Sequence, residues 1–100
     1  MPGFLFCAGL VAANGTILRL TGQVGFSVGR LAGYARGVWT IQFTSAHPLG
    51  STYIVIPSAQ NCVFYVSTGP APTATKFTIC TFVSGSVTLV DAVFSFMVPA

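Results

Sequence analysis

The sequence predicts an all-β fold: a single jelly-roll-like β-sandwich of about eight short antiparallel strands spanning residues 1–100. Strand-like segments recur about every eight to twelve residues and are separated by Gly, Pro, Asn and Ser. No segment keeps a helical hydrophobic period over about three turns. The 100 residues are enough for one domain with its own core and too few for two.

The segment from Val38 to Thr44 gives the clearest strand signal. Its apolar positions are Trp39, Ile41 and Phe43, and the positions between them are polar. Side chains alternate between the two faces of a strand, so we expect these three to face the core. The other expected strands, in chain order, span Phe4–Ala12, Thr16–Leu20, Val24–Val28, Tyr53–Ile56, Cys62–Val66, Lys76–Val83 and Val87–Val98.

Turn-forming residues separate these segments. Asn14-Gly15 predicts a hairpin because both residues tolerate positive φ. The same pair begins a glycosylation sequon with Thr16, for which a turn is the favoured explanation. Pro57 is expected to end a strand, because proline cannot donate to a ladder. Loops are expected over Arg30–Gly37, His47–Gly50 and Ser67–Thr75, and a turn at Ser84-Gly85-Ser86 is expected to join the last two strands as a hairpin.

Few side chains are charged, although 53% of the residues are hydrophobic. The charged residues are 5% of the chain, whereas a soluble domain usually has about a quarter. The predicted last strand is also apolar on both faces, and a sandwich buries only one face of each sheet. We therefore expect a symmetric oligomer, most simply a homotrimer, in which the outer side of that strand is covered. The residues assigned to this interface are Leu89, Asp91, Val93 and Met97.

Composition argues against several classes of function. The net charge of +3 comes from scattered cations, so we expect no nucleic-acid binding. No run of about eighteen apolar residues predicts membrane insertion. No signal peptide is predicted, because no positive region precedes the first apolar run. Three cysteines without a C-x-x-C motif suggest free buried thiols in a reducing compartment, with a Cys62–Cys80 bridge as the alternative.

No catalytic, cofactor or metal site is predicted. Gly25-x-Ser27-x-Gly29 matches the nucleophile-elbow pattern, but no helix is expected after Ser27. Asp91 is the only acidic residue, so one chain has no carboxylate pair for glycoside hydrolysis. His47, the only histidine, is expected to be an ordinary loop residue; a shared metal site on a threefold axis is the alternative. Asp91 itself is expected to pair with an arginine or to be partly solvated, because an isolated buried charge is costly.

The densest group of ligand-binding side chains lies in the loop over Arg30–Gly37. Arg30, Tyr34 and Arg36 combine two guanidinium groups with an aromatic ring, a set that suits sugars or anionic groups. Loops of β-sandwiches often carry function. These three residues are the predicted ligand site, and ordinary solvated loop residues are the alternative.

The Trp-containing segment WTIQFTSAHPLGSTYIV and the terminal AVFSFMV carry a family resemblance. Over Val38–Ala100 the chain resembles short trimeric β-sandwich heads of viral and phage fibres and, more distantly, complement and tumour-necrosis-factor heads. The resemblance implies a non-enzymatic homotrimer on a virion surface or outside cells. It also implies attachment to a host-cell glycan or surface protein, with no cofactor. Two alternatives remain: a trimerisation or capping module without a receptor, and a secreted tumour-necrosis-factor-like ligand head.

Overall fold

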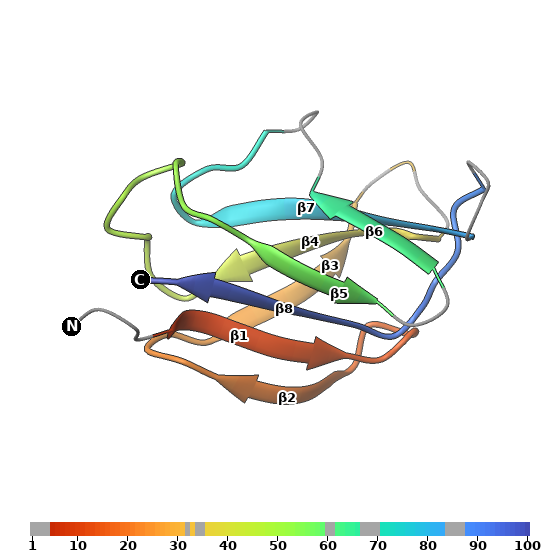
Figure 1. Cartoon of the computed structure of the whole chain (residues 1–100), viewed down its shortest axis with the longest axis horizontal. Helices are drawn as coiled ribbons and strands as arrows, with labels where there is room; N and C mark the ends of the chain where they lie inside the picture. Colours follow the sequence, from red (N-terminus) through yellow and green to blue (C-terminus); the bar gives the residue numbers. More distant parts are fainter. Residues whose placement is uncertain (1–4, 32, 34–35, 60–61, 67–70, 84–87) are drawn as a thin grey trace.

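The computed structural model describes residues 5–31, 33, 36–59, 62–66, 71–83 and 88–100, with the backbone alone at 59 and 62–65. The described residues form two four-stranded antiparallel sheets (Figure 1), which confirms the predicted all-β sandwich. Sheet A has the order β2 (Ile17–Thr21), β1 (Leu5–Val11), β8 (Phe94–Pro99), β5 (Ile56–Ala59). Sheet B has the order β3 (Phe26–Arg30), β4 (Val38–Phe43), β7 (Lys76–Val83), β6 (Cys62–Val66). Within these residues, no helix is long and apolar enough to cross a membrane.

In each sheet the two central strands are distant in the sequence. β1 pairs with β8 in sheet A, and β4 pairs with β7 in sheet B. β5 extends sheet A beside β8, and β6 extends sheet B beside β7. β2 and β3 are the remaining edge strands of sheets A and B.

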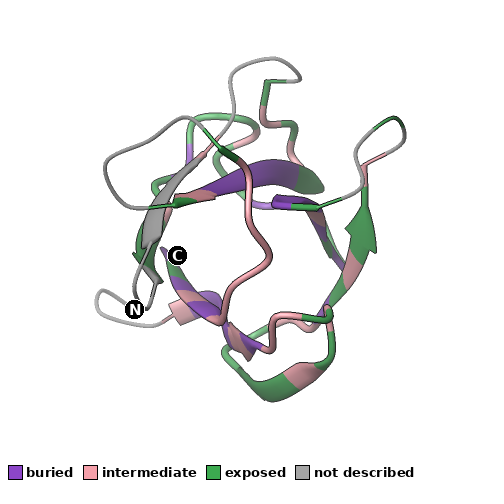
Figure 2. Cartoon of the chain, turned by 90° about the vertical axis from the view of Figure 1, so that its right-hand side faces the viewer, coloured by how far each residue is buried: buried purple, intermediate pink, exposed green. Residues whose placement is uncertain are grey.

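The core lies between the sheets and is rich in aromatic rings. The predicted inward set of β4 is confirmed, because Trp39, Ile41 and Phe43 are all buried. Phe77 and Phe96 meet across the layers with ring centroids 5.5 Å apart in an edge arrangement, which aromatic pairs favour. Viewed along the long axis, the strands of the two sheets surround this core (Figure 2), and β2 is exposed along most of its length.

A glycine makes room for one of these rings. Gly9 lies in β1 on the inner face of sheet A, and a Cβ at this position would lie only 2.2 Å from the Phe26 ring. Phe26 uses that space to pack edge-on against Phe96, with centroids 4.9 Å apart. The absence of a side chain at Gly9 therefore lets the edge strand β3 contact the centre of sheet A.

The prediction for Asn14-Gly15 is confirmed and the prediction for Pro57 is wrong. The Asn14-Gly15 turn between β1 and β2 is confirmed: Gly15 has φ of 89°, and Asn14 Oδ1 accepts a hydrogen bond from Thr16 N. The prediction that Pro57 ends a strand is wrong, because β5 runs from Ile56 to Ala59 and includes it. β5 is the edge strand of sheet A, where a residue without an N–H is tolerated.

The prediction of one strand over Val87–Val98 is wrong. β8 begins only at Phe94, because the preceding residues pass from sheet B to sheet A. Residues 88–90 still pair with the end of β7 in the expected antiparallel sense. Phe82 and Leu89 form a bridge, and Val90 N donates a hydrogen bond to Thr81 O. The predicted turn over 84–86 lies outside the described residues. Within β8 the predicted alternation is confirmed, because Phe94, Phe96 and Val98 are buried and Met97 is 42% exposed.

Candidate functional site

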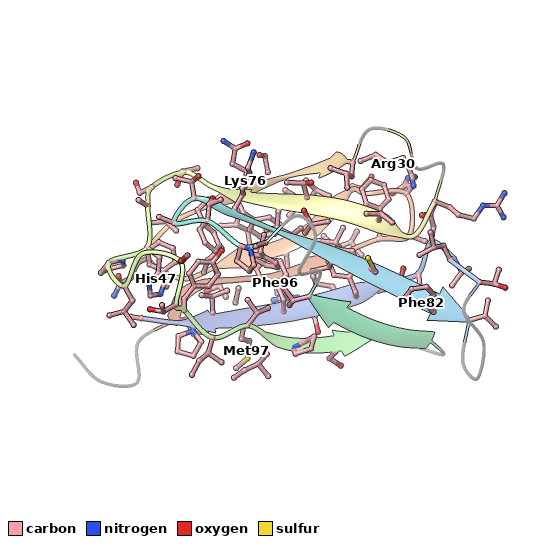
Figure 3. All side chains as sticks on the ribbon, turned by 90° about the horizontal axis from the view of Figure 1, so that it is seen from above. Arg30, His47, Lys76, Phe82, Phe96 and Met97 are labelled. Atoms are coloured by element: carbon pink, nitrogen blue, oxygen red, sulfur yellow. The ribbon has the colours of Figure 1, made fainter. Side chains whose placement is uncertain are left out.

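Arg30 and Asp91 form an ion pair at one end of the sandwich. Arg30 Nη1 and Nη2 donate hydrogen bonds of 3.1 and 3.0 Å to the two carboxylate oxygens of Asp91. The guanidinium carbon also lies 4.1 Å from the Trp39 ring centroid, a cation–π distance. In the register of the sheet, Arg30 is opposite the inward-facing Trp39, so its side chain lies over the end of the core. Figure 3 labels Arg30 at one end of the long axis and His47 at the other.

Gly37 holds the other side of the Asp91 carboxylate. Its N–H donates to Asp91 Oδ1 over 2.6 Å, and its carbonyl accepts from Thr81 N. Gly37 has φ of 74°, and a Cβ here would lie 2.8 Å from Val90 N. Both the backbone conformation and the close contact therefore require glycine. The crossing segment 88–93 is thus fixed against the end of the loop that precedes β4.

These contacts lower the pKa of Asp91. The main cause is the side-chain hydrogen bonding from Arg30; the Gly37 N–H and the charges of Arg30 and Arg36 act in the same direction, and partial burial opposes them. The same hydrogen bonds raise the pKa of the Arg30 guanidinium. The expectation that Asp91 pairs with an arginine is confirmed. Among the described residues this is the only salt bridge.

The structure does not bring the predicted ligand set together as three free side chains. Arg30 directs both terminal nitrogens to Asp91. Arg36 is exposed, and its charge acts on the same carboxylate. Tyr34 lies outside the described residues. A ligand at this end would therefore meet Arg36 directly, whereas it would have to compete with Asp91 for Arg30.

His47 has a structural position at the opposite end. It is 3% exposed, and its ring lies between those of Phe6 and Tyr53, with centroid distances of 4.5 and 5.0 Å. Nδ1 accepts from Leu49 N over 3.1 Å, so Nε2 carries the proton and donates to Pro99 O over 2.9 Å. Both ring nitrogens are thus occupied within the chain, which leaves neither for a metal ion.

The serine of the nucleophile-elbow pattern lies in the middle of an ordinary ladder. Ser27 is in β3, opposite Gln42 in β4, and it is exposed. The only histidine has both ring nitrogens bound elsewhere, and the only acid is bound to Arg30. Across the part of the chain that the structure describes, no three His, Cys, Asp or Glu side chains gather as metal ligands.

Two of the three cysteines are described with their side chains. Cys7 faces the core from β1 as a free thiol, and its burial raises its pKa to about 11. Cys80 is buried in β7. The Cys62 side chain lies outside the described residues, so the alternative of a Cys62–Cys80 bridge is not tested.

The four residues predicted to form a trimer interface do not share one strand face. Leu89, Asp91 and Val93 lie in the crossing segment before β8, where all three are half-buried. Met97 alone lies on the outer face of β8. The expected common face is therefore wrong, because the chain is not extended as one strand through 87–98. The interface itself stays a prediction.

The outer face of sheet A carries apolar side chains in two neighbouring rows. One row across all four strands consists of Thr21, Ala8, Met97 and Ile56, each directly opposite the next. The neighbouring row consists of Arg19, Leu10, Ser95 and Ser58. We call the group Ala8, Leu10, Ile56 and Met97 the apolar face. Ile56 and Met97 are 47% and 42% exposed, and Arg19 on the edge strand is the only charge in either row.

A shallow open depression of about 270 Å³ lies within the apolar face. The small side chains of Ala8 and Ser95 form part of its lining, together with the larger Leu10, Arg19 and Met97. The surface is therefore uneven, with a protruding methionine beside a hollow.

Two neighbouring rows on the outer face of sheet B carry no apolar side chain. Ser27, Gln42 and Lys76 form one row across β3, β4 and β7, and all three are exposed. Gly29, Thr40 and Thr78 form the next row, in which the two threonine hydroxyls are 3.4 Å apart. Lys76 and Met97 project from opposite sides of the sandwich (Figure 3). Exposed apolar side chains thus lie on the sheet A side and an exposed polar row on the sheet B side.

No protein-family profile, curated protein or solved structure matches the chain.

Sequence reasoning missed both outer faces as continuous surfaces. The signal for the apolar face was available in β8, where Met97 alternates with buried phenylalanines. Ala8, Leu10 and Ile56 become its neighbours only through the strand order, which periodicity along one strand does not reveal.

Proposed function

We propose that the chain is the non-enzymatic head domain of a viral fibre or spike that assembles as a homotrimer and attaches to a host surface. The apolar face of sheet A is the observation that carries this proposal. Exposed apolar groups gathered on one face usually mark an interaction site. Further copies of the same chain are the occupant that we propose for it. The threefold arrangement and the viral setting come from the resemblance of Val38–Ala100 to fibre heads.

The charges of the chain favour self-association over an ion-paired partner. Asp91, the only side-chain carboxylate, is held by Arg30 away from the apolar face. Arg19 lies in the edge strand β2, where the guanidinium stays at the rim of a contact and keeps its water. Covering Ile56 and Met97 would then bury apolar surface without burying an unpaired charge.

A second function, a trimerisation or capping module without a receptor, is favoured by one observation. The best candidate for ligand recognition, Arg30, already directs both terminal nitrogens to Asp91. A structural role would need only the apolar face. Binding of host cells or glycans by the purified protein separates the two functions, because a capping module would bind neither host cells nor glycans.

Light scattering of the purified chain tests the assembly. We expect a monodisperse trimer at micromolar concentration, and Met97→Asp should give a folded monomer because it places a charge in the covered face. Gln42→Glu, which adds a carboxylate to the polar face of sheet B, is the matched control and should stay trimeric. A folded wild-type monomer would contradict the proposal.

A further inference from the structure

The polar face of sheet B stays open if the apolar face of sheet A is covered by other copies. The two faces lie on opposite sides of the sandwich. Self-association through sheet A therefore leaves sheet B pointing away from the contact. This polar side is then available to a ligand of the assembly.

A row of three side chains on this side has no hydrogen-bonding partner among the residues that the structure describes. Ser27, Gln42 and Lys76 lie directly opposite one another on β3, β4 and β7, and we call them the polar row. Opposite residues on neighbouring strands are about 5 Å apart, so the row spans about 10 Å. None of the three side chains makes a hydrogen bond or ion pair within the described residues. Their donors and acceptors are free to bind a ligand.

The neighbouring row gives the surface its shape. Thr40 and Thr78 lie within hydrogen-bonding distance of each other through their hydroxyls. Gly29, next to Thr40 in the ladder, has no atom within 4 Å of where its Cβ would be. The side of the polar row next to Gly29 is therefore open, which gives a flat ligand access to Gln42 and Ser27.

The charges on this face favour an acidic ligand. Lys76 is the only charged residue in the two rows, and its ammonium forms no ion pair within the described part of the chain. The only side-chain carboxylate of the chain is committed to Arg30. A single cation is too little for a nucleic-acid backbone, which needs several phosphate contacts. The lack of apolar side chains in the row also makes it unsuitable as the centre of a protein interface.

We propose that the polar row binds a carbohydrate that carries an acidic group. The Gln42 amide and the Ser27 hydroxyl would exchange hydrogen bonds with sugar hydroxyls. Lys76 would donate to the carboxylate or sulfate, as a charge-assisted hydrogen bond. This inference rests on the attachment role in the proposed function and moves the contact from the loop over Arg30–Gly37 to a sheet face.

Titration of isotope-labelled protein with 3′-sialyllactose, a heparin tetrasaccharide and uncharged lactose tests the proposal. We expect saturable amide shifts in β3, β4 and β7 for at least one acidic probe, with lactose binding at least about tenfold more weakly. Lys76→Gln and Gln42→Ala should each weaken that binding about tenfold or more, because each removes a direct polar contact. Gln23→Ala, at an exposed glutamine outside the row, should bind as the wild type does.

Three results would overturn the proposal: equal affinity for lactose, unchanged binding by both row variants, or no saturable shift with either acidic probe. Shifts around Arg36, lost in Arg36→Ala, would place attachment at the predicted loop and reject the polar row alone. Light scattering of the same samples keeps the assembly question separate, because a trimer without binding rejects this inference and leaves self-association standing.

Discussion

Arg30 and Asp91 are 61 positions apart in the chain, and two hydrogen bonds of 3.1 and 3.0 Å join them. The pair connects the end of β3 to the segment through which the chain leaves sheet B for sheet A. Asp91 is also the only Asp or Glu in the sequence. The only acidic side chain that can titrate in this protein is therefore the one bound to Arg30.

Asp91→Asn should change the response of the fold to acid. The pKa of Asp91 is lowered in the folded chain, below an unfolded value of about 3.9. The pair therefore stabilises the fold above about pH 4, and this stabilisation is lost as the pH falls through the folded-state pKa. Asp91→Asn should melt at a lower temperature than the wild type at neutral pH, and its melting temperature should fall less on acidification. Melting curves that shift in parallel for both proteins would contradict this.

Gly9→Ala should destabilise the fold, because the new methyl group would overlap the Phe26 ring. Overpacking of this kind costs about 1–3 kcal/mol, measurable by urea denaturation. Phe26→Leu, added to Gly9→Ala, should restore part of the loss by vacating the space. Gly29→Ala is the matched control in a strand: its Cβ would meet nothing, so stability should stay the same or rise slightly. Equal losses in the two alanine variants would show that the fit of Phe26 against Gly9 does not matter.

Phe96→Asp should prevent folding. The ring is 1% exposed and packs against Phe26 and Phe77. An unpaired carboxylate at that position costs several kcal/mol, comparable to the stability of a small domain. Circular dichroism should show loss of the cooperative transition, whereas Met97→Asp, one residue further, should retain it. A native melting curve for Phe96→Asp would mean that the inward register of β8 is wrong.

Tyr53→Phe should weaken the attachment of the segment before β7. Tyr53 Oη lies 2.7 Å from Thr73 O and 2.9 Å from Lys76 O, and the hydroxyl is worth about 1 kcal/mol as a hydrogen-bond donor. Burial raises the pKa of Tyr53 to about 12. The raised pKa stabilises the fold fully below the unfolded value of about 10, and the stabilisation is lost as the pH rises through about 12.

Thermal unfolding between neutral and alkaline pH tests the role of this hydroxyl. The melting temperature of the wild type should fall at high pH. Tyr53→Phe should have a lower melting temperature at neutral pH, and that temperature should fall less at high pH. Ultraviolet titration should show one tyrosine fewer ionising late in the variant. If the late-ionising tyrosine persisted in Tyr53→Phe, the assignment of the raised pKa would be wrong.

Local pattern predicted the strands better than their connections. Trp39, Ile41 and Phe43 alternate strictly, so their burial followed from the geometry of a strand. Pro57 was misjudged because a proline is tolerated in an edge strand, and only the strand order shows that β5 is an edge. The break before Phe94 was missed because apolar alternation continues through residues that cross between the layers. The sequence predicted that Asp91 pairs with an arginine but not that the arginine is Arg30, because that choice depends on contacts between distant segments.

The pairing of β1 with β8 has a consequence for how the chain folds. These two strands come from opposite ends of the sequence, yet they lie side by side in the middle of sheet A. The ribosome must therefore release β8 before sheet A can close. Contacts between such distant residues make folding slow, and the early-made strands wait with apolar edges uncovered. Until β8 has emerged, one long edge of β1 consequently has no strand to pair with.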